Sequence, residues 1–298
     1  MGNPSLRADI LCLVTALIWG LAFVAQRVGM DYMGPLGFNG IRFALGALVL
    51  APLAVRSLRY PPPVPFLSGG ETGFPWTGGL MAGSVLFAGA TLQQVGLKYT
   101  TAGKAGFITG LYVVLVPLLG LLFRQRPARG DVVGAVLAVI GLYFLSVTED
   151  FSLAPGDGLE LLGACFWAGH VLLIGWLSPR TRALPLATAQ YAVCAVLSLV
   201  GAVLFEDLTL AGVRGAAVPI LYGGILSVGL AYTLQVVAQR DAKPTHAAIL
   251  LSFESVFAAL CGALMLDERL DTRGLIGCGL MFAGMLVSQL WPRSRATR

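Results

Sequence analysis

The sequence contains few charged residues, and this scarcity is its first informative feature. Only 12% of the 298 residues are Asp, Glu, Lys or Arg, whereas soluble globular domains carry about a quarter. Hydrophobic residues, by contrast, make up 57% of the chain. This composition excludes a soluble fold and predicts an all-α integral membrane protein embedded in a lipid bilayer.

The sequence also lacks the short motifs that identify common catalytic and metal sites. It has no GxSxG, no GxxxxGKS or GxxxxGKT, and no GxGxxG after a strand. The five cysteines show no CxxC spacing, and His246 has no HxxxH or HExxH companion. We therefore expect no enzyme, no cofactor and no metal, and we exclude a primary pump that acts alone. The net charge of +5 does not indicate nucleic-acid binding, because the basic residues occupy short gaps between apolar runs.

Apolar runs of about 20 residues, the length needed to cross a bilayer, follow one another along the whole chain. Breaks at Gly, Pro and charged clusters predict ten transmembrane helices. Their predicted ranges are 8–29, 34–55, 76–98, 102–123, 129–147, 156–177, 183–205, 213–238, 242–266 and 272–291. The one long connection, 56–75, is rich in proline and glycine and predicts a stiff surface loop.

The distribution of basic residues predicts the orientation in the membrane. With the N-terminus inside, most of the 20 Lys and Arg residues fall in cytoplasmic segments. Such an excess is typical of the cytoplasmic side. We therefore expect a multi-pass protein of the bacterial inner membrane with both termini in the cytoplasm.

The two halves of the chain resemble each other weakly. Aligning 8–24 with 156–172 superposes Asp9 on Asp157 and Trp19 on Trp167, and aligning 92–112 with 234–254 superposes Gln93 on Gln235. Five spans per repeat is an odd number, so the second copy must enter the membrane from the opposite side. We expect two inverted five-helix repeats, residues 1–150 and 151–298, around a central cavity, as in transporters that work by alternating access.

Four segments carry a resemblance to the EamA family of the drug/metabolite transporter superfamily. They are ALIWGLAFV at 16–24, IRFALGALVL at 41–50, GKAGFITGLYVVLVPLLG at 103–120 and FESVFAALCGALMLDERLDTRGLIGCGLMFAGMLV at 253–287. The usual Glu-Pro-Val of the ninth helix is Glu-Ser-Val here, so its kink proline is missing, whereas Pro117 stands in the fourth helix. Within the family the chain is most similar to amino-acid exporters of the YddG type.

Polar and aromatic residues deep in predicted spans are the candidates for substrate binding, because polar groups in a bilayer normally face a partner or a watery cavity. Gln93 and Gln235 could bind a polar solute across one cavity, or form an interhelical hydrogen bond. Trp19 and Trp167 could stack on a flat solute, or simply pack. The complete set of candidates is Trp19, Arg42, Gln93, Tyr112, Trp167, His170, Tyr232, Gln235, Phe253 and Glu254.

Three charged or titratable candidates could act in more than one way. Glu254 and His170 could bind a proton or a substrate ammonium, or be satisfied within the protein. Arg42 could bind a substrate carboxylate, pair with an acid or anchor its helix.

The resemblance implies a secondary transporter or facilitator whose substrates are small metabolites, in particular neutral or aromatic amino acids, and that exports them. Export of hydrophobic drugs or cations by the same fold is the alternative, which Glu254 favours. A membrane-embedded enzyme using His170 and Glu254 is more remote, because no activated nucleophile or metal motif accompanies them.

Overall fold

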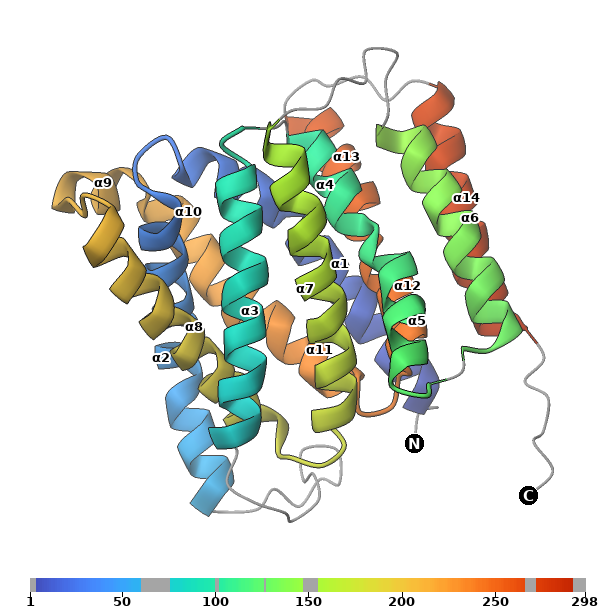
Figure 1. Ribbon diagram of the computed structural model, residues 1–298, viewed down its shortest axis with the longest axis horizontal. Helices are drawn as coiled ribbons and strands as arrows, with labels where there is room; N and C mark the ends of the chain where they lie inside the picture. Colours follow the sequence, from blue (N-terminus) through green and yellow to red (C-terminus); the bar gives the residue numbers. More distant parts are fainter. Residues whose placement is uncertain are drawn as a thin grey trace.

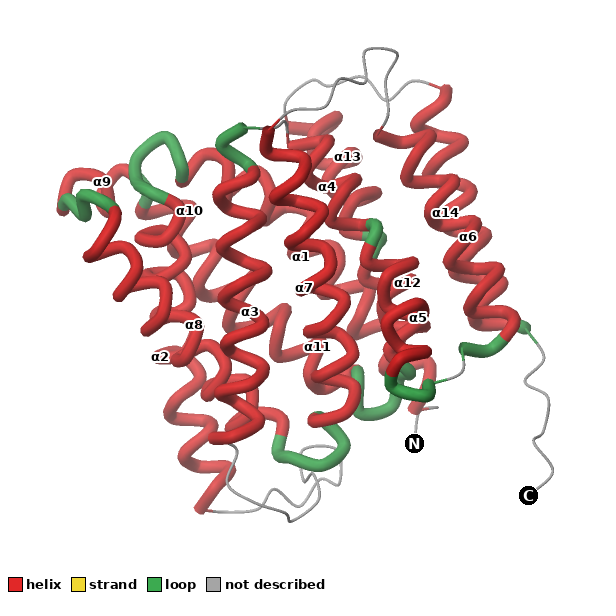
Figure 2. Tube along the Cα trace, viewed as in Figure 1, coloured by secondary structure: helices red, strands yellow, loops and turns green. Residues whose placement is uncertain are grey.

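The computed structural model describes residues 4–59, 76–99, 102–125, 127–146, 155–265 and 272–291, and no strand occurs within these ranges. Helices run side by side along most of the chain (Figures 1 and 2). In order they are α1 (Pro4–Gly29), α2 (Pro35–Arg59), α3 (Trp76–Gly96), α4 (Ala102–Gly110), α5 (Tyr112–Leu122), α6 (Arg129–Ser146), α7 (Pro155–Leu177), α8 (Ala183–Phe205), α9 (Leu210–Gly215), α10 (Ala217–Leu221), η1 (Tyr222–Tyr232), α11 (Thr233–Ala238), α12 (Pro244–Leu251), α13 (Glu254–Met265) and α14 (Thr272–Leu290).

Each predicted span coincides with a helix or with a series of shorter helices, but three spans are interrupted. The predicted helix 102–123 is divided into α4 and α5, and 242–266 is divided into α12 and α13. The predicted helix 213–238 comprises the end of α9, α10, η1 and α11. Within these three predicted spans the helix is divided or changes its type. Most of the predicted loop 56–75 lies outside the described residues.

The surface of this bundle is that of a membrane protein. Leu48, Val203 and Phe205 are 70%, 74% and 80% exposed. Soluble monomers rarely expose contiguous apolar surface of this kind. Six helical segments within the described residues are long and apolar enough to cross a bilayer: 6–29, 35–59, 105–122, 155–177, 183–205 and 217–238. The count of ten spans stays a prediction.

Small residues allow the closest helix contacts. α6 packs along α14, and a Cβ placed on Gly134 would lie 2.6 Å from the carbonyl oxygen of Gly284. A Cβ on Gly141 would lie 2.6 Å from the carbonyl oxygen of Gly277. The sequence left open whether such glycines serve contacts within the chain or between subunits. Here they serve contacts within the chain.

The helix pairs in contact follow a pattern. Besides α6 with α14, α2 packs on α8, α3 packs on α7 and α8, and η1 packs on α1 and α2. α1 also contacts α12 and α13, and α7 contacts α4 and α5. The counterparts by order along the two halves are α1 and α7, α2 and α8, α3 and η1, α4 and α12, α5 and α13, and α6 and α14. Each of these contacts has a matching contact between the counterpart helices.

Candidate functional site

Two helix breaks lie at aligned positions of the two halves. Leu111 separates α4 from α5, and Ser252 and Phe253 separate α12 from α13. The second break forms without a proline; the Ser252 hydroxyl donates to the carbonyl oxygen of Ile249 at 2.9 Å. Tyr112 and Glu254 are the first residues of the helices after the two breaks. The breaks therefore bring these two side chains into the middle of the bundle.

The π-helix η1 forms a second irregular segment beside α1. Its sequence, YGGILSVGLAY, is rich in glycine, and π-helical turns are frequent at functional sites. The side chains of Thr15 and Trp19 on α1 donate to carbonyl oxygens of η1 at 3.2 and 3.4 Å, and the Tyr222 hydroxyl donates to the carbonyl oxygen of Ile18 at 2.8 Å. These bonds hold Trp19 and Tyr232 in one place.

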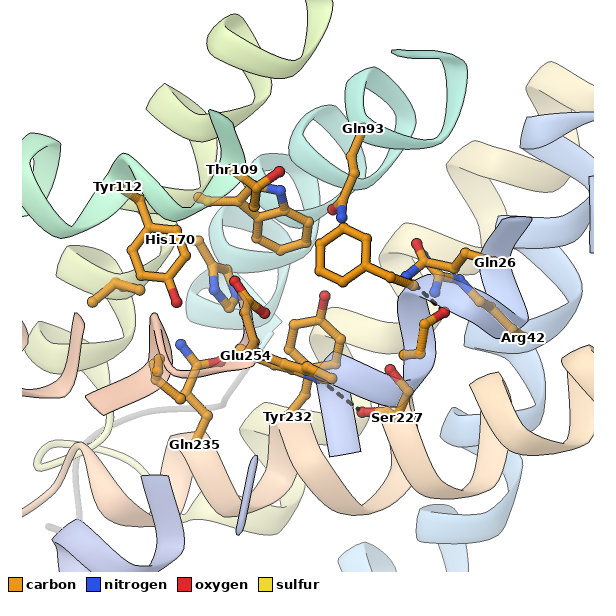
Figure 3. A pocket seen from close by; sticks show the side chains of 16 residues that line it. Gln26, Arg42, Gln93, Thr109, Tyr112, His170, Ser227, Tyr232, Gln235 and Glu254 are labelled. Carbon is orange, nitrogen blue, oxygen red and sulfur yellow. Dashed lines mark hydrogen bonds between the residues drawn. The ribbon is translucent and has the colours of Figure 1, made fainter. Parts of the chain in front are cut away.

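A cavity lies between the breaks and η1 (Figure 3). Its lining residues come from both halves of the chain: Trp19, Ala22, Phe23, Gln26, Arg42, Gln93, Thr109, Tyr112, Trp167, His170, Val171, Ser227, Tyr232, Gln235, Leu251 and Glu254. Its volume of about 40 Å³ leaves room for a few water molecules. Any larger solute requires these helices to move apart.

Aromatic rings form one wall of the cavity, and Tyr232 is their common contact. Its ring centroid lies 4.5 Å from that of Trp19 and 6.1 Å from that of Trp167, with the second pair stacked at an interplanar angle of 24°. Phe43 and His170 lie 6.0 and 6.2 Å from Tyr232. Such separations are typical of favourable aromatic pairs. The wall offers flat apolar surfaces to a solute.

One basic and one acidic side chain, Arg42 and Glu254, also reach the cavity. Arg42 is buried; its Nε donates to Oδ1 of Asn39 at 3.0 Å, and its guanidinium lies over the rings of Phe38 and Phe43 at 5.4 and 5.1 Å. No carboxylate within the described parts of the chain forms an ion pair with it. In Figure 3 Glu254 lies in the middle of the cavity and Arg42 at one side of it. A buried charge of this kind normally needs a partner.

The amides and the imidazole form a partly satisfied set of polar groups. Nε2 of His170 donates to Oε1 of Gln190 at 2.9 Å, and Nε2 of Gln235 donates to Oε1 of Gln239 at 3.0 Å. Oε1 of Gln235 and Nε1 of Trp167 are buried without a hydrogen-bond partner among the described residues. Buried polar atoms are normally satisfied. A bound solute or water could satisfy these two.

Sequence reasoning proposed most of the lining and missed part of it. All the proposed residues line the cavity except Phe253, which lies in the hydrophobic core. Gln93 and Gln235 lie on opposite sides of the cavity in Figure 3. The polar lining residues that were missed are Gln26, Thr109 and Ser227. Gln26 follows Trp19 by seven residues on α1, so the two share a helical face, and that spacing was the signal that could have found it. Thr109 lies beside a helix break and Ser227 in the π-helix, where regular spacing is no guide.

The comparisons with known proteins agree with this architecture. A family model, described as the EamA-like transporter family, matches residues 6–147 and again residues 154–289. An uncharacterised transporter of Archaeoglobus fulgidus is 32% identical over 97% of this chain and 88% of its own length. The uncharacterised inner membrane transporter YedA of Escherichia coli K12 is 26% identical over 91% of this chain and 87% of its own length. A crystal structure at 20% identity superposes with a TM-score of 0.78 over 96% of this chain and 99% of that one.

The apolar surface and the long helices that surround a central cavity define, over the described residues, a helical membrane protein. The family matches together span most of the chain. The protein belongs to the EamA-like transporter family, and the family and its relatives point to a membrane transporter rather than to an enzyme.

Proposed function

We propose that this chain is a secondary transporter or facilitator that exports neutral or aromatic amino acids, or similar zwitterionic metabolites, across the bacterial inner membrane. The observation that carries the substrate class is the cavity itself, which joins the unpaired Arg42 guanidinium, the buried Glu254 carboxyl and an aromatic wall. An α-carboxylate suits Arg42, an α-ammonium suits Glu254, and an aromatic side chain suits the rings of Trp19, Trp167 and Tyr232.

The transport mechanism that we propose is alternating access of two inverted five-helix repeats, residues 1–150 and 151–298, with ten spans in all. Three observations support it: the family matches each half separately, the helix breaks lie at aligned positions, and the helix contacts are preserved when the halves are exchanged. The narrow cavity is consistent with a closed state between two open ones.

The proposed location and orientation rest on two further observations. The relative YedA is described as an inner membrane transporter. The start of α1 and the end of α14 lie at the same end of the bundle, because Asp9 and Ser288 both bond to His246. Together with the basic residues at this end, this arrangement favours both termini in the cytoplasm.

The direct test is counterflow of labelled phenylalanine, tryptophan and leucine in proteoliposomes that contain the purified protein. Arg42→Gln should raise the KM for the amino acid by about 10- to 150-fold, which corresponds to losing a charged hydrogen bond of about 1.5–3 kcal/mol. The same variant should change the KM for the amino-acid amide little, because the amide has no carboxylate. Arg56→Gln is the matched control, because Arg56 is an exposed arginine of the same helix.

Two results would contradict the proposal. One is the absence of flux for every amino acid in the wild-type protein. The other is an equal loss of affinity for amino acid and amide in Arg42→Gln, with Arg42→Lys rescuing neither.

Export of organic cations is the second candidate, because Glu254 is a buried carboxyl beside aromatic rings. Flux of a monovalent cationic dye that Glu254→Gln abolishes and Arg42→Gln leaves intact would favour this alternative over amino acids.

A further inference from the structure

A chain of short polar contacts lies away from the cavity, at the end of the bundle where α1 begins. Nε2 of His246 lies 2.8 Å from Oδ1 of Asp9, and Nδ1 of His246 lies 2.8 Å from Oγ of Ser288. Oγ of Ser288 in turn lies 2.8 Å from Oδ1 of Asp131. All four residues are at most 7% exposed. The contacts join α1 and α6 of the first half to α12 and α14 of the second.

The three contacts need one hydrogen more than a neutral histidine and a serine supply. Three contacts of hydrogen-bond length need three hydrogens, one between each pair of heavy atoms. A neutral histidine supplies one, the serine hydroxyl supplies one, and ionised carboxylates supply none. With both aspartates ionised and His246 neutral, one contact would therefore place two acceptors 2.8 Å apart. Closing all three contacts requires one more proton.

The surroundings of the two aspartates indicate where that proton resides. Oδ2 of Asp131 accepts a hydrogen bond from the backbone N–H of Ala128 at 3.1 Å, and its Oδ1 faces the Ser288 hydroxyl. Asp131 thus accepts a hydrogen bond through each of its two oxygens. Ser288 then donates to Asp131, Nδ1–H of His246 donates to Ser288, and the third hydrogen lies between His246 and Asp9.

The remaining charges at this end are at the surface. Among the described residues on the helices and turns packed around α12, the exposed charged side chains are Arg7, Arg124, Arg129, Arg180, Asp241 and Lys243, and Arg182 and Arg240 are half-buried. Solvent and salt screen exposed charges strongly. The groups that exchange the proton are accordingly Asp9 and His246, with Ser288 and Asp131 completing the chain.

We propose that Asp9, His246, Ser288 and Asp131 form a proton-binding site that holds the α1 end of the bundle closed across the two halves. Loss of the proton places two acceptors in contact and releases the connection between Asp9 on α1 and His246 on α12. The site lies about 15 Å from Trp19 along α1, at 1.5 Å per residue, so the proton is not bound in the cavity. The proton site rests on this geometry alone; only its coupling to transport rests on the proposed function.

The sign of the pH dependence follows from linkage. The closed form binds one proton more than the open form, so raising the pH favours opening. The equilibrium constant for opening rises by up to about tenfold per pH unit in the range where the open form has lost the proton. Asp9→Asn should remove this dependence without breaking the chain. The amide nitrogen of asparagine can donate to Nε2 of a neutral His246 and supplies the third hydrogen permanently.

Cys12 provides the measurement, because it lies one helical turn after Asp9 and is fully buried. In full-length protein in nanodiscs, with the other four cysteines replaced by alanine, alkylation of Cys12 by N-ethylmaleimide would be followed between about pH 5.5 and pH 8.5. Each rate is divided by the rate of the SDS-unfolded protein at the same pH, which corrects for the titration of the thiol when it is exposed.

The parent is the protein in which Cys12 is the one remaining cysteine. Its normalised alkylation rate should rise with pH, whereas the rate of its Asp9→Asn variant should stay low at every pH. Asp157→Asn is the matched control, because Asp157 aligns with Asp9 and starts α7 in the other half; its rate should rise as in the parent. A flat profile in the parent, a rising profile in Asp9→Asn, or a loss of the rise in Asp157→Asn would each overturn the proposal. Absence of amino-acid flux alongside the expected profiles would reject the proposed substrate and leave the proton site standing.

Discussion

The contact between α6 and α14 makes a quantitative prediction about stability. A Cβ placed on Gly284 would lie 2.6 Å from the carbonyl oxygen of Gly134 and 3.2 Å from the amide nitrogen of Ala138. Both neighbours are backbone atoms, so no side-chain rotation can make room for the methyl group. Overpacking of this kind costs about 1–3 kcal/mol. Gly284→Ala should therefore raise the unfolding equilibrium constant by about 5- to 150-fold.

Gly279 supplies the control within the same helix. A Cβ at this position would meet no atom within 4 Å. Alanine is a better helix former than glycine by about 1 kcal/mol, so Gly279→Ala should be as stable as the wild type or slightly more so. Gly141→Ala should behave like Gly284→Ala, because its Cβ would lie 2.6 Å from the carbonyl oxygen of Gly277.

SDS titration in mixed micelles, followed by far-ultraviolet circular dichroism, measures the free energy of unfolding of these variants. Gly284→Ala should unfold at a clearly lower SDS fraction than Gly279→Ala. If the two variants unfold together, the backbones of α6 and α14 do not approach as closely as described, and the reasoning from glycine contacts fails.

Two further substitutions test other parts of the bundle. The Glu206 carboxylate accepts hydrogen bonds from two backbone N–H groups at the start of α2, each at 2.8 Å. Glu206→Gln leaves one acceptor oxygen and should lower the free energy of unfolding by about 1–2 kcal/mol in the same SDS titration. Asp207→Asn, at an exposed position, should not change stability. Trp19→Ala removes the ring whose centroid lies 4.5 Å from that of Tyr232. It should raise the KM for tryptophan about 2- to 10-fold in the counterflow assay. Trp19→Phe keeps an aromatic ring and should raise this KM less.

Hydrophobic periodicity was sufficient to locate the helices, because a span of apolar residues between polar breaks has few alternatives in a bilayer. The predicted span 183–205 coincides with α8, and 129–147 coincides with α6 over its described residues. Irregular helices were not predictable in the same way. The π-helix η1 and the breaks at Leu111 and Ser252 replace hydrogen bonds that composition alone would assign to an ordinary α-helix.

The candidate site was partly predictable for the same reason. Polar and aromatic side chains in apolar spans must find partners, so Arg42, Glu254 and Trp167 were expected to face an interior, and they line one cavity. Phe253 directly precedes Glu254 and lies in the turn between α12 and α13, but it does not line the cavity. A break in the helix changes which face a residue presents, and the sequence pattern contains no record of that change.

The sequence by itself determined that this chain is a helical membrane protein, because charge scarcity and apolar length depend on composition and on the length of apolar runs. Only the tertiary structure decided which distant residues meet. Asp9 and His246 are 237 positions apart, and neither belongs to a local motif that would predict their contact. A proton-binding site built across four helices depends on heavy-atom distances of 2.8 Å, and such distances arise from packing rather than from spacing along the chain.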